Sequence, residues 1–173
     1  HAEKLLALLR KLGYRERAGS WGHPGRTAIF VGDFIDRGPE QLKSVETVRS
    51  MVRDGKALAV MGNHEFNAIA WHTPDPGQEG EFLRRHDCPK YGKKNREQHA
   101  AFLREVEFAP EVHAGVIEWF MELPLWLDLP GIRVVHACWH SPFMEWLAPR
   151  LNESRQLRWS SLAEAAREPD ERR

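Results

Sequence analysis

The sequence predicts an α/β fold, in which a β-sheet core is flanked by helices. Thr27–Val31 and Ala57–Met61 are short apolar runs of the kind that form buried strands. Between them, apolar residues recur at helical spacing: Leu42, Val45, Val48, Met51 and Val52. A strand, a helix and a strand in this order make a βαβ unit, so the two strands should be parallel.

Further elements are expected on both sides of this unit. Leucines at helical spacing predict a helix over Ala2–Leu12, with Gly13 as its stop. Residues 15–26 hold three glycines and a proline and are expected to form a loop. Leu125–Leu129 and Ile132–His136 are predicted to be two strands joined by a Pro-Gly turn.

Residues 66–112 differ from the rest of the chain because they are polar and mix Pro, Gly, His and charged side chains. Helical patches are expected around Glu97–Val106, and Val116–Met121 is also expected to be helical. We predict one domain over residues 1–173, with residues 66–112 inserted over one end of the sheet.

Composition narrows the class of protein. With 42% hydrophobic and 29% charged residues, the 173-residue chain is typical of a single globular domain. The formal net charge is zero, so charge gives no sign of a nucleic-acid partner. No apolar run approaches the roughly 20 residues of a membrane span. The two cysteines lie far apart without metal-ligand spacing, which favours a reducing, cytoplasmic setting.

Three predicted strands end at polar residues of metal-binding type, namely Asp33, Asn63 and His136. Ligand sites of open α/β sheets form beyond the carboxyl ends of the strands. A carboxylate, an amide oxygen and an imidazole suit Mn²⁺, Fe or Zn²⁺. Each residue alone would be read as a strand-end turn or a core histidine, but the three together predict a metal site.

The residues around these positions carry a family resemblance. Gly32-Asp33-Phe34-Ile35-Asp36-Arg37-Gly38, Gly62-Asn63-His64-Glu65 and Val134-Val135-His136-Ala137 are similar, in order, to the second, third and fourth signatures of the calcineurin-like metallophosphoesterases. Within that superfamily, the chain most resembles the branch of bacterial serine/threonine phosphoprotein phosphatases and symmetrical dinucleoside tetraphosphate hydrolases. The resemblance implies a partial version of the layered metallophosphoesterase fold.

The resemblance also implies two divalent metal ions, with Mn²⁺ preferred and Fe or Zn²⁺ as alternatives. Asp33 would bridge them, since two neighbouring cations need a shared anion. Asn63 and His136 would bind the second metal. The glycines at 32 and 62 would let the backbone turn sharply into the crevice.

The same resemblance assigns catalytic roles. His64 would be the general acid, Asp36 would hold its imidazole, and Arg37 would bind phosphate oxygens through its planar fork. The nucleophile would be a metal-bound water. Glu65 is expected to orient its loop rather than take part in the chemistry.

Other residues give weaker signals. Four histidines are expected to be solvated or core residues rather than ligands: His72, His86, His99 and His113. His140 is a minor candidate for the crevice, and Trp71 and Trp139 are candidates for stacking on a base.

Two elements of the family pattern have no match. The first Asp-x-His pair is missing, and His1-Ala2-Glu3 resembles the residues that follow that pair. The last metal-binding histidine has no convincing match after His140. We therefore expect a fragment that lacks the first and last strands, with most ligands of the first metal missing.

The predicted function is hydrolysis of a phosphate monoester or phosphoanhydride, in a phosphoprotein, a dinucleoside polyphosphate or a small phosphate ester. Substrate choice is expected to lie in residues 66–112. One alternative is a non-catalytic binding module of the same fold, which the missing ligands favour but the presence of His64, Asp36 and Arg37 opposes. Another is a polynucleotide-end phosphatase of an RNA-repair system.

Overall fold

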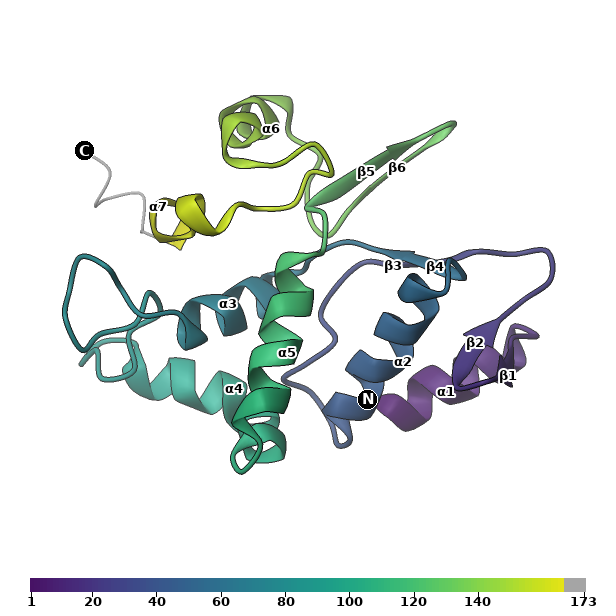
Figure 1. Cartoon of the computed structure of the whole chain (residues 1–173), viewed down its shortest axis with the longest axis horizontal. Helices are drawn as coiled ribbons and strands as arrows, with labels where there is room; N and C mark the ends of the chain where they lie inside the picture. Colours follow the sequence, from purple (N-terminus) through teal and green to yellow (C-terminus); the bar gives the residue numbers. More distant parts are fainter. Residues whose placement is uncertain (167–173) are drawn as a thin grey trace.

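The structure is a computed structural model that describes residues 1–166 (Figure 1). The last seven residues of the predicted 1–173 domain lie outside the described residues. Helices and strands are mixed, as the α/β prediction requires, and the strands form three two-stranded sheets. None of the helices within residues 1–166 is long and apolar enough to cross a membrane.

The central βαβ unit is confirmed. Strand β3 (Ala28–Phe30) pairs in parallel with β4 (Ala57–Ala59), and helix α2 (Gln41–Arg53) connects them. Both strands are shorter than predicted, but the chain stays paired beyond them, since the Val60 amide donates to the Phe30 carbonyl at 3.0 Å. Parallel pairing brings the carboxyl ends of β3 and β4 to the same edge.

The N-terminal segment holds one correction. Helix α1 (Ala2–Lys11) is present as predicted, but residues 15–26 are not only a loop, because β1 (Arg15–Arg17) and β2 (Ser20–Gly22) form an antiparallel hairpin. The turn residues Ala18 and Gly19 both have positive φ, at 50° and 78°. Two such residues match the twist of a tight hairpin, but alanine is an unusual residue at the first position.

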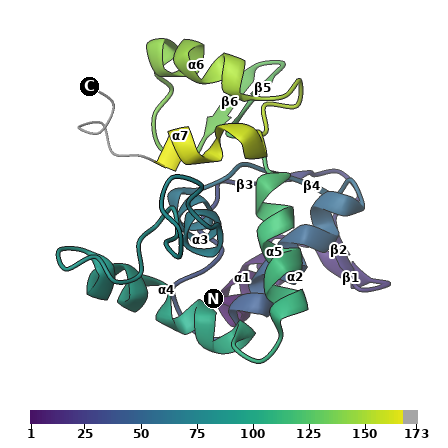
Figure 2. The ribbon, with the colours of Figure 1, turned by 60° about the vertical axis from the view of Figure 1, so that its left-hand side comes forward.

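Three helices surround the unit on its other side (Figures 1 and 2). They are α3 (Asn63–His72), α4 (Gly92–Val106) and α5 (Pro110–Met121). The sequence did not predict α3, and α4 begins five residues before the expected patch. Ile69, Phe102 and Phe120 from these helices are buried in the main core. The description of residues 66–112 as an insertion stays a prediction, although their helices contribute to that core.

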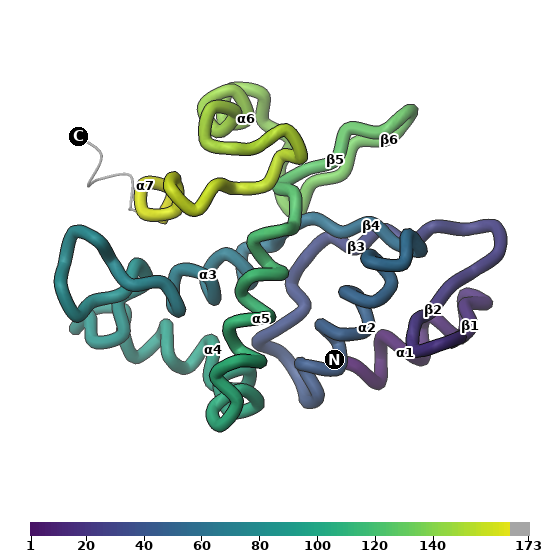
Figure 3. The backbone as a smooth tube through the Cα atoms, viewed as in Figure 1, coloured from purple at the N-terminus to yellow at the C-terminus, as the bar shows by residue number. Residues whose placement is uncertain are grey.

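The C-terminal part begins with the predicted hairpin, in which β5 (Trp126–Leu129) pairs antiparallel with β6 (Ile132–Val135). The Met61 amide donates to the Pro124 carbonyl at 2.9 Å, which ties the start of this hairpin to the end of β4. Helix α6 (Ser141–Leu147) and the short helix α7 (Leu162–Ala166) follow, and in Figure 3 α6 lies at the top of the view with α7 below it, above α3.

Candidate metal and catalytic site

The three predicted metal ligands meet at one edge of the fold. Asp33 follows β3, Asn63 follows β4, and His136 follows β6. The Nε2 atom of His136 lies 3.0 Å from Oδ1 of Asn63 and 3.5 Å from Oδ1 of Asp33. The predicted convergence is therefore confirmed, while the role of these residues as ligands stays a prediction.

Two glycines allow the loops after β3 and β4 to touch. Gly32 has φ of 86°, and a Cβ at this position would lie 2.4 Å from the Gly62 nitrogen. A Cβ on Gly62 would lie 2.7 Å from the Asp33 nitrogen. No side chain fits at either place, so glycine is required for the close approach. Asp33 itself has φ of 61°, a left-handed conformation that is uncommon for residues other than glycine.

Glu65 stabilises this arrangement of the two loops through hydrogen bonds to their backbone amides. It is completely buried, and its carboxylate accepts hydrogen bonds from the amides of Asp33, Phe34 and Gly62 at 2.8 to 2.9 Å. Burial raises the pKa of Glu65, and these three amides act in the opposite direction. Glu65 thus has the loop-orienting contacts that the sequence led us to expect.

The hydrogen bonds of His136 determine which of its nitrogens faces the site. Its Nδ1 donates to the Val31 carbonyl, so in a neutral imidazole Nε2 is the nitrogen that presents a lone pair. That lone pair faces the oxygens of Asn63 and Asp33, neither of which has a proton to donate. Three acceptors turned toward one point suit a cation between them. The donor set therefore fits a divalent metal.

His64 and Asp36 are in contact as predicted, while the role of His64 as an acid stays a prediction. Nδ1 of His64 lies 2.7 Å from Oδ2 of Asp36, whose side chain is only 1% exposed. The Nε2 atom of His64 is 4.0 Å from Oδ2 of Asp33, so the ring faces the proposed metal site. Arg37 is exposed, and no hydrogen bond or ion pair engages it within residues 1–166.

Two residues of the 66–112 range contact this pair, and a third, Arg84, contacts one of the two. His99 is 1% exposed, and its Nδ1 lies 2.8 and 3.0 Å from the two carboxylate oxygens of Asp36. Nε2 of Gln98 is 3.5 Å from Nδ1 of His64, and Arg84 donates to Oε1 of Gln98 at 2.8 Å. The sequence identified none of the three as a site residue. A signal was present for His99, because it shares the buried face of α4 with Phe102 and Val106.

The weaker candidates have other contacts. His140 accepts from the Phe143 amide at the start of α6, and Trp139 lies under Arg133 at 5.0 Å. Trp71 is buried, and His86 stacks on its ring with centroids 3.7 Å apart. Base stacking by Trp71 or Trp139 stays a prediction.

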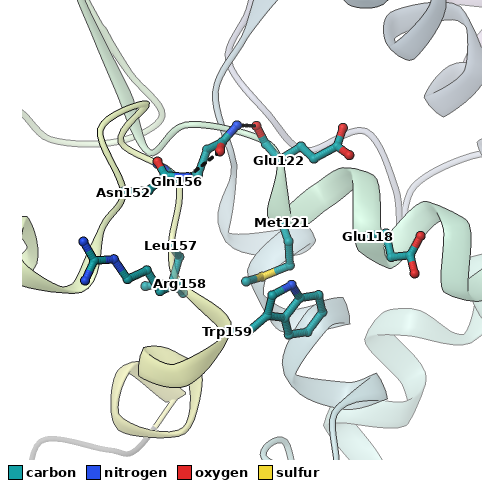
Figure 4. A pocket seen from close by; sticks show the side chains of 8 residues that line it. All are labelled: Glu118, Met121, Glu122, Asn152, Gln156, Leu157, Arg158 and Trp159. Atoms are coloured by element: carbon teal, nitrogen blue, oxygen red, sulfur yellow. Dashed lines mark hydrogen bonds between the residues drawn. The ribbon is translucent and has the colours of Figure 1, made fainter.

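Two further observations delimit the site. Within residues 1–166, His, Cys, Asp and Glu side chains form no group of three that could hold a metal, and one of the three converging donors is the amide of Asn63. An open pocket of about 620 Å³ lies between α5 and residues 152–159, but none of the predicted site residues lines it (Figure 4).

Comparison with known proteins identifies the class. The family model of the calcineurin-like phosphoesterases matches residues 1–144, and the chain belongs to this family. Family membership implies divalent metal ions, in agreement with the donor set of Asp33, Asn63 and His136.

Similar proteins include dinucleoside tetraphosphatases of both cleavage types. The chain is 41% identical over 143 residues to an asymmetrical bis(5′-nucleosyl)-tetraphosphatase, PrpE, of Oceanobacillus iheyensis, covering 78% of this chain and 50% of that protein. It is 46% identical over 63 residues to the PrpE protein of Halalkalibacterium halodurans, covering 36% of this chain and 26% of that protein. A symmetrical bis(5′-nucleosyl)-tetraphosphatase of Ralstonia nicotianae is 30% identical over 108 residues, 62% of this chain and 31% of that protein. The chain thus spans half or less of the length of these relatives.

Proposed function

We propose that this chain is part of a metal-dependent phosphoesterase that hydrolyses a phosphate monoester or a phosphoanhydride. The observation that carries the proposal is the convergence of three acceptors, on Asp33, Asn63 and His136, beside an imidazole held by a buried carboxylate. A scaffold that only binds a partner has no chemical need for this combination.

The metal site would be held by Asp33, Asn63 and His136, with Asp33 placed to bridge two ions and Mn²⁺ as the preferred metal. Divalent cations in such a site lower the pKa of water and offset negative charge on phosphate oxygens. The neutral side chains of Asn63 and His136 hold a cation without adding charge that repels the substrate.

His64 would act as general acid. Asp36 accepts from Nδ1 of His64, which leaves Nε2 on the side of Asp33. A proton on Nε2 would pass to the leaving oxygen as the bond to phosphorus breaks. Arg37, exposed at the same loop, would donate two hydrogen bonds to phosphate oxygens.

A nucleotide with a phosphoanhydride chain is our preferred substrate class. Both kinds of relative in the comparison are named for dinucleoside tetraphosphates. Their names differ in the symmetry of cleavage, so the nucleotide products have to be analysed to identify the bond that breaks.

The test is a substrate panel with the full-length protein that contains this chain, in the presence of Mn²⁺. The panel holds a dinucleoside tetraphosphate, a phosphopeptide, para-nitrophenyl phosphate and an oligonucleotide with a terminal phosphate. We expect phosphate-bond hydrolysis that a chelator abolishes and Mn²⁺ restores, with highest kcat/KM on the tetraphosphate. Equal or unequal nucleotide products identify the cleaved bond.

Two results would redirect the proposal. Preference for the oligonucleotide would favour a polynucleotide-end phosphatase. No turnover on any substrate, together with normal folding, would favour a non-catalytic binding module.

A further inference from the structure

We propose that His99 is a positioning residue, which holds the Asp36 carboxylate so that Asp36 in turn orients His64. This inference rests on the proposed phosphoesterase function. It assigns to helix α4, within residues 66–112, a part in the chemistry as well as in the core.

The geometry places one carboxylate between two imidazoles. Nδ1 of His64 lies 2.7 Å from Oδ2 of Asp36, and Nδ1 of His99 lies 2.8 Å from the same oxygen and 3.0 Å from Oδ1. A carboxylate only accepts, so each imidazole carries a proton on Nδ1. Without His99, Oδ1 of Asp36 would have no partner among the hydrogen bonds of residues 1–166.

The backbone and the side chain of Asp36 are held by different partners. Its φ is 72°, in the left-handed region. Its amide donates to Oε1 of Gln41 at 2.7 Å, which holds the main chain. That bond leaves rotation of the side chain free. The contact with His99 restricts that rotation, and the two contacts together define the direction in which Asp36 faces His64.

If His99 only filled space in the core, its second ring nitrogen would make histidine a poor choice. Nε2 is buried and has no hydrogen-bond partner within residues 1–166. Burying an unpaired ring nitrogen costs stability, and a leucine or phenylalanine would fill the space without that cost. The Asp36 contact is the only polar contact of the imidazole in this part of the chain, so it is the interaction that requires a histidine.

Neighbours of the array act on the same pair. Gln98, next to His99 on α4, places Nε2 at 3.5 Å from Nδ1 of His64, a packing contact because both atoms are donors, and Arg84 donates to Oε1 of Gln98. The rings of Trp71 and His99 pack in an edge-type arrangement with centroids 5.8 Å apart. Two consecutive residues of α4 thus contact both members of the acid pair.

The test compares two substitutions of His99 in the full-length protein. His99→Phe keeps a ring in the core but removes the donor, whereas His99→Asn loses the ring but places an amide donor where Nδ1 lies. Phe102→Leu, one turn along the same buried face of α4, is the matched control for loss of packing. Each variant is assayed on phenyl phosphate, a poor leaving group that needs the acid, and on para-nitrophenyl phosphate, which needs it less.

We expect His99→Phe to lower kcat on phenyl phosphate by about 30-fold and on para-nitrophenyl phosphate by only about threefold, with KM within about twofold, because residues that orient a functional side chain typically contribute 10- to 100-fold. His99→Asn should recover most of the loss on phenyl phosphate. Phe102→Leu should affect both substrates equally.

Three outcomes would overturn the proposal: equal losses on the two substrates in His99→Phe, higher activity in His99→Phe than in His99→Asn, or wild-type activity in His99→Phe. If melting curves show that His99→Phe does not fold, the Asn variant alone decides. Equal losses of kcat on the two substrates in His99→Asn would then contradict the proposal. Failure of the phosphoesterase function is distinguishable because the wild-type protein would then turn over neither substrate.

Discussion

The site is built from two halves that are supported very differently. The anchored half consists of residues 32–37 and 62–65, and the hairpin half consists of β5–β6 with His136. In the anchored half, Glu65 accepts from three amides and Asp36 contacts two imidazoles, and both carboxylates are buried. In the hairpin half, His136 donates to one carbonyl, that of Val31, and its Nε2 lies 3.0 and 3.5 Å from the oxygens of Asn63 and Asp33.

This difference indicates that the anchored half is fixed before a metal binds, whereas the hairpin half depends more on the metal. Buried hydrogen bonds fix the anchored half without help from a cation. His136 has only one fixed contact besides the proposed ligands, so its position should depend more on what lies between the three acceptors. We therefore expect substitutions in the anchored half to affect folding or chemistry strongly, and those at His136 to act mainly through metal affinity.

The largest effect should follow Asp33→Asn. The substitution removes the proposed bridging charge, so kcat/KM should fall about a thousandfold, equivalent to about 4 kcal/mol of transition-state stabilisation. Folding should not suffer, because asparagine tolerates the left-handed conformation at least as well as aspartate. Steady-state assays and thermal melts measure both. Activity near that of the wild type would remove Asp33 from the proposed metal site.

Glu65→Gln should come next and act on stability. A glutamine has one acceptor oxygen in place of two and turns an amide NH₂ toward backbone donors, so the free energy of unfolding should fall by about 3 kcal/mol. Urea unfolding measures this. Glu145→Gln on the exposed surface of α6 is the control and should change stability by less than about 0.5 kcal/mol. A loss for Glu65→Gln as small as for the control would mean that the three amides do not depend on the carboxylate.

His136→Ala tests the hairpin half. We expect roughly 30-fold weaker Mn²⁺ binding, about 2 kcal/mol, with little change in melting temperature of the metal-free protein. Calorimetric titration with Mn²⁺ provides the affinity. If the variant instead unfolds as readily as Glu65→Gln, the hairpin half is a structural element, and the distinction between the halves is wrong.

The smallest effect concerns the pH dependence of stability that His113 on helix α5 contributes. Burial, with a contribution from His72, lowers the pKa of His113 to about 4 from 6.5. The unfolded chain therefore binds a proton below pH 6.5 that the folded chain does not, and this stability is lost as the pH falls from 6.5 toward 4. His113 is only partly buried, so we expect a loss of about 1 kcal/mol. His113→Leu should have a flatter stability curve over this range, and an unchanged pH dependence would contradict the assignment.

The strand-end residues were predictable because their signal is local. Asp33 and Asn63 each follow an apolar run and a glycine, and parallel pairing of β3 with β4 then brings them together. Glu65 was identified as a loop-orienting residue in the same way. The second and third signatures contain all the predicted catalytic residues, so sequence reasoning located the candidate residues that lie close to strand ends.

The contribution of α4 was not predictable by the same means. His99 lies 63 positions from Asp36, and no pattern indicates which buried group a histidine on an apolar helix face will contact. The β1–β2 hairpin was missed for a different reason, since Ala18 at positive φ gives no turn signal. Helix α3 was missed because its apolar residues form a run near its end rather than a clear helical stripe.

The most direct test is a crystal structure of the full-length protein with Mn²⁺, using anomalous scattering to locate the metal. The account predicts a peak within about 2.5 Å of Asp33 Oδ, Asn63 Oδ1 and His136 Nε2 together. A peak elsewhere, or none at a Mn²⁺ concentration that supports hydrolysis, would contradict the claim that these three side chains hold the metal.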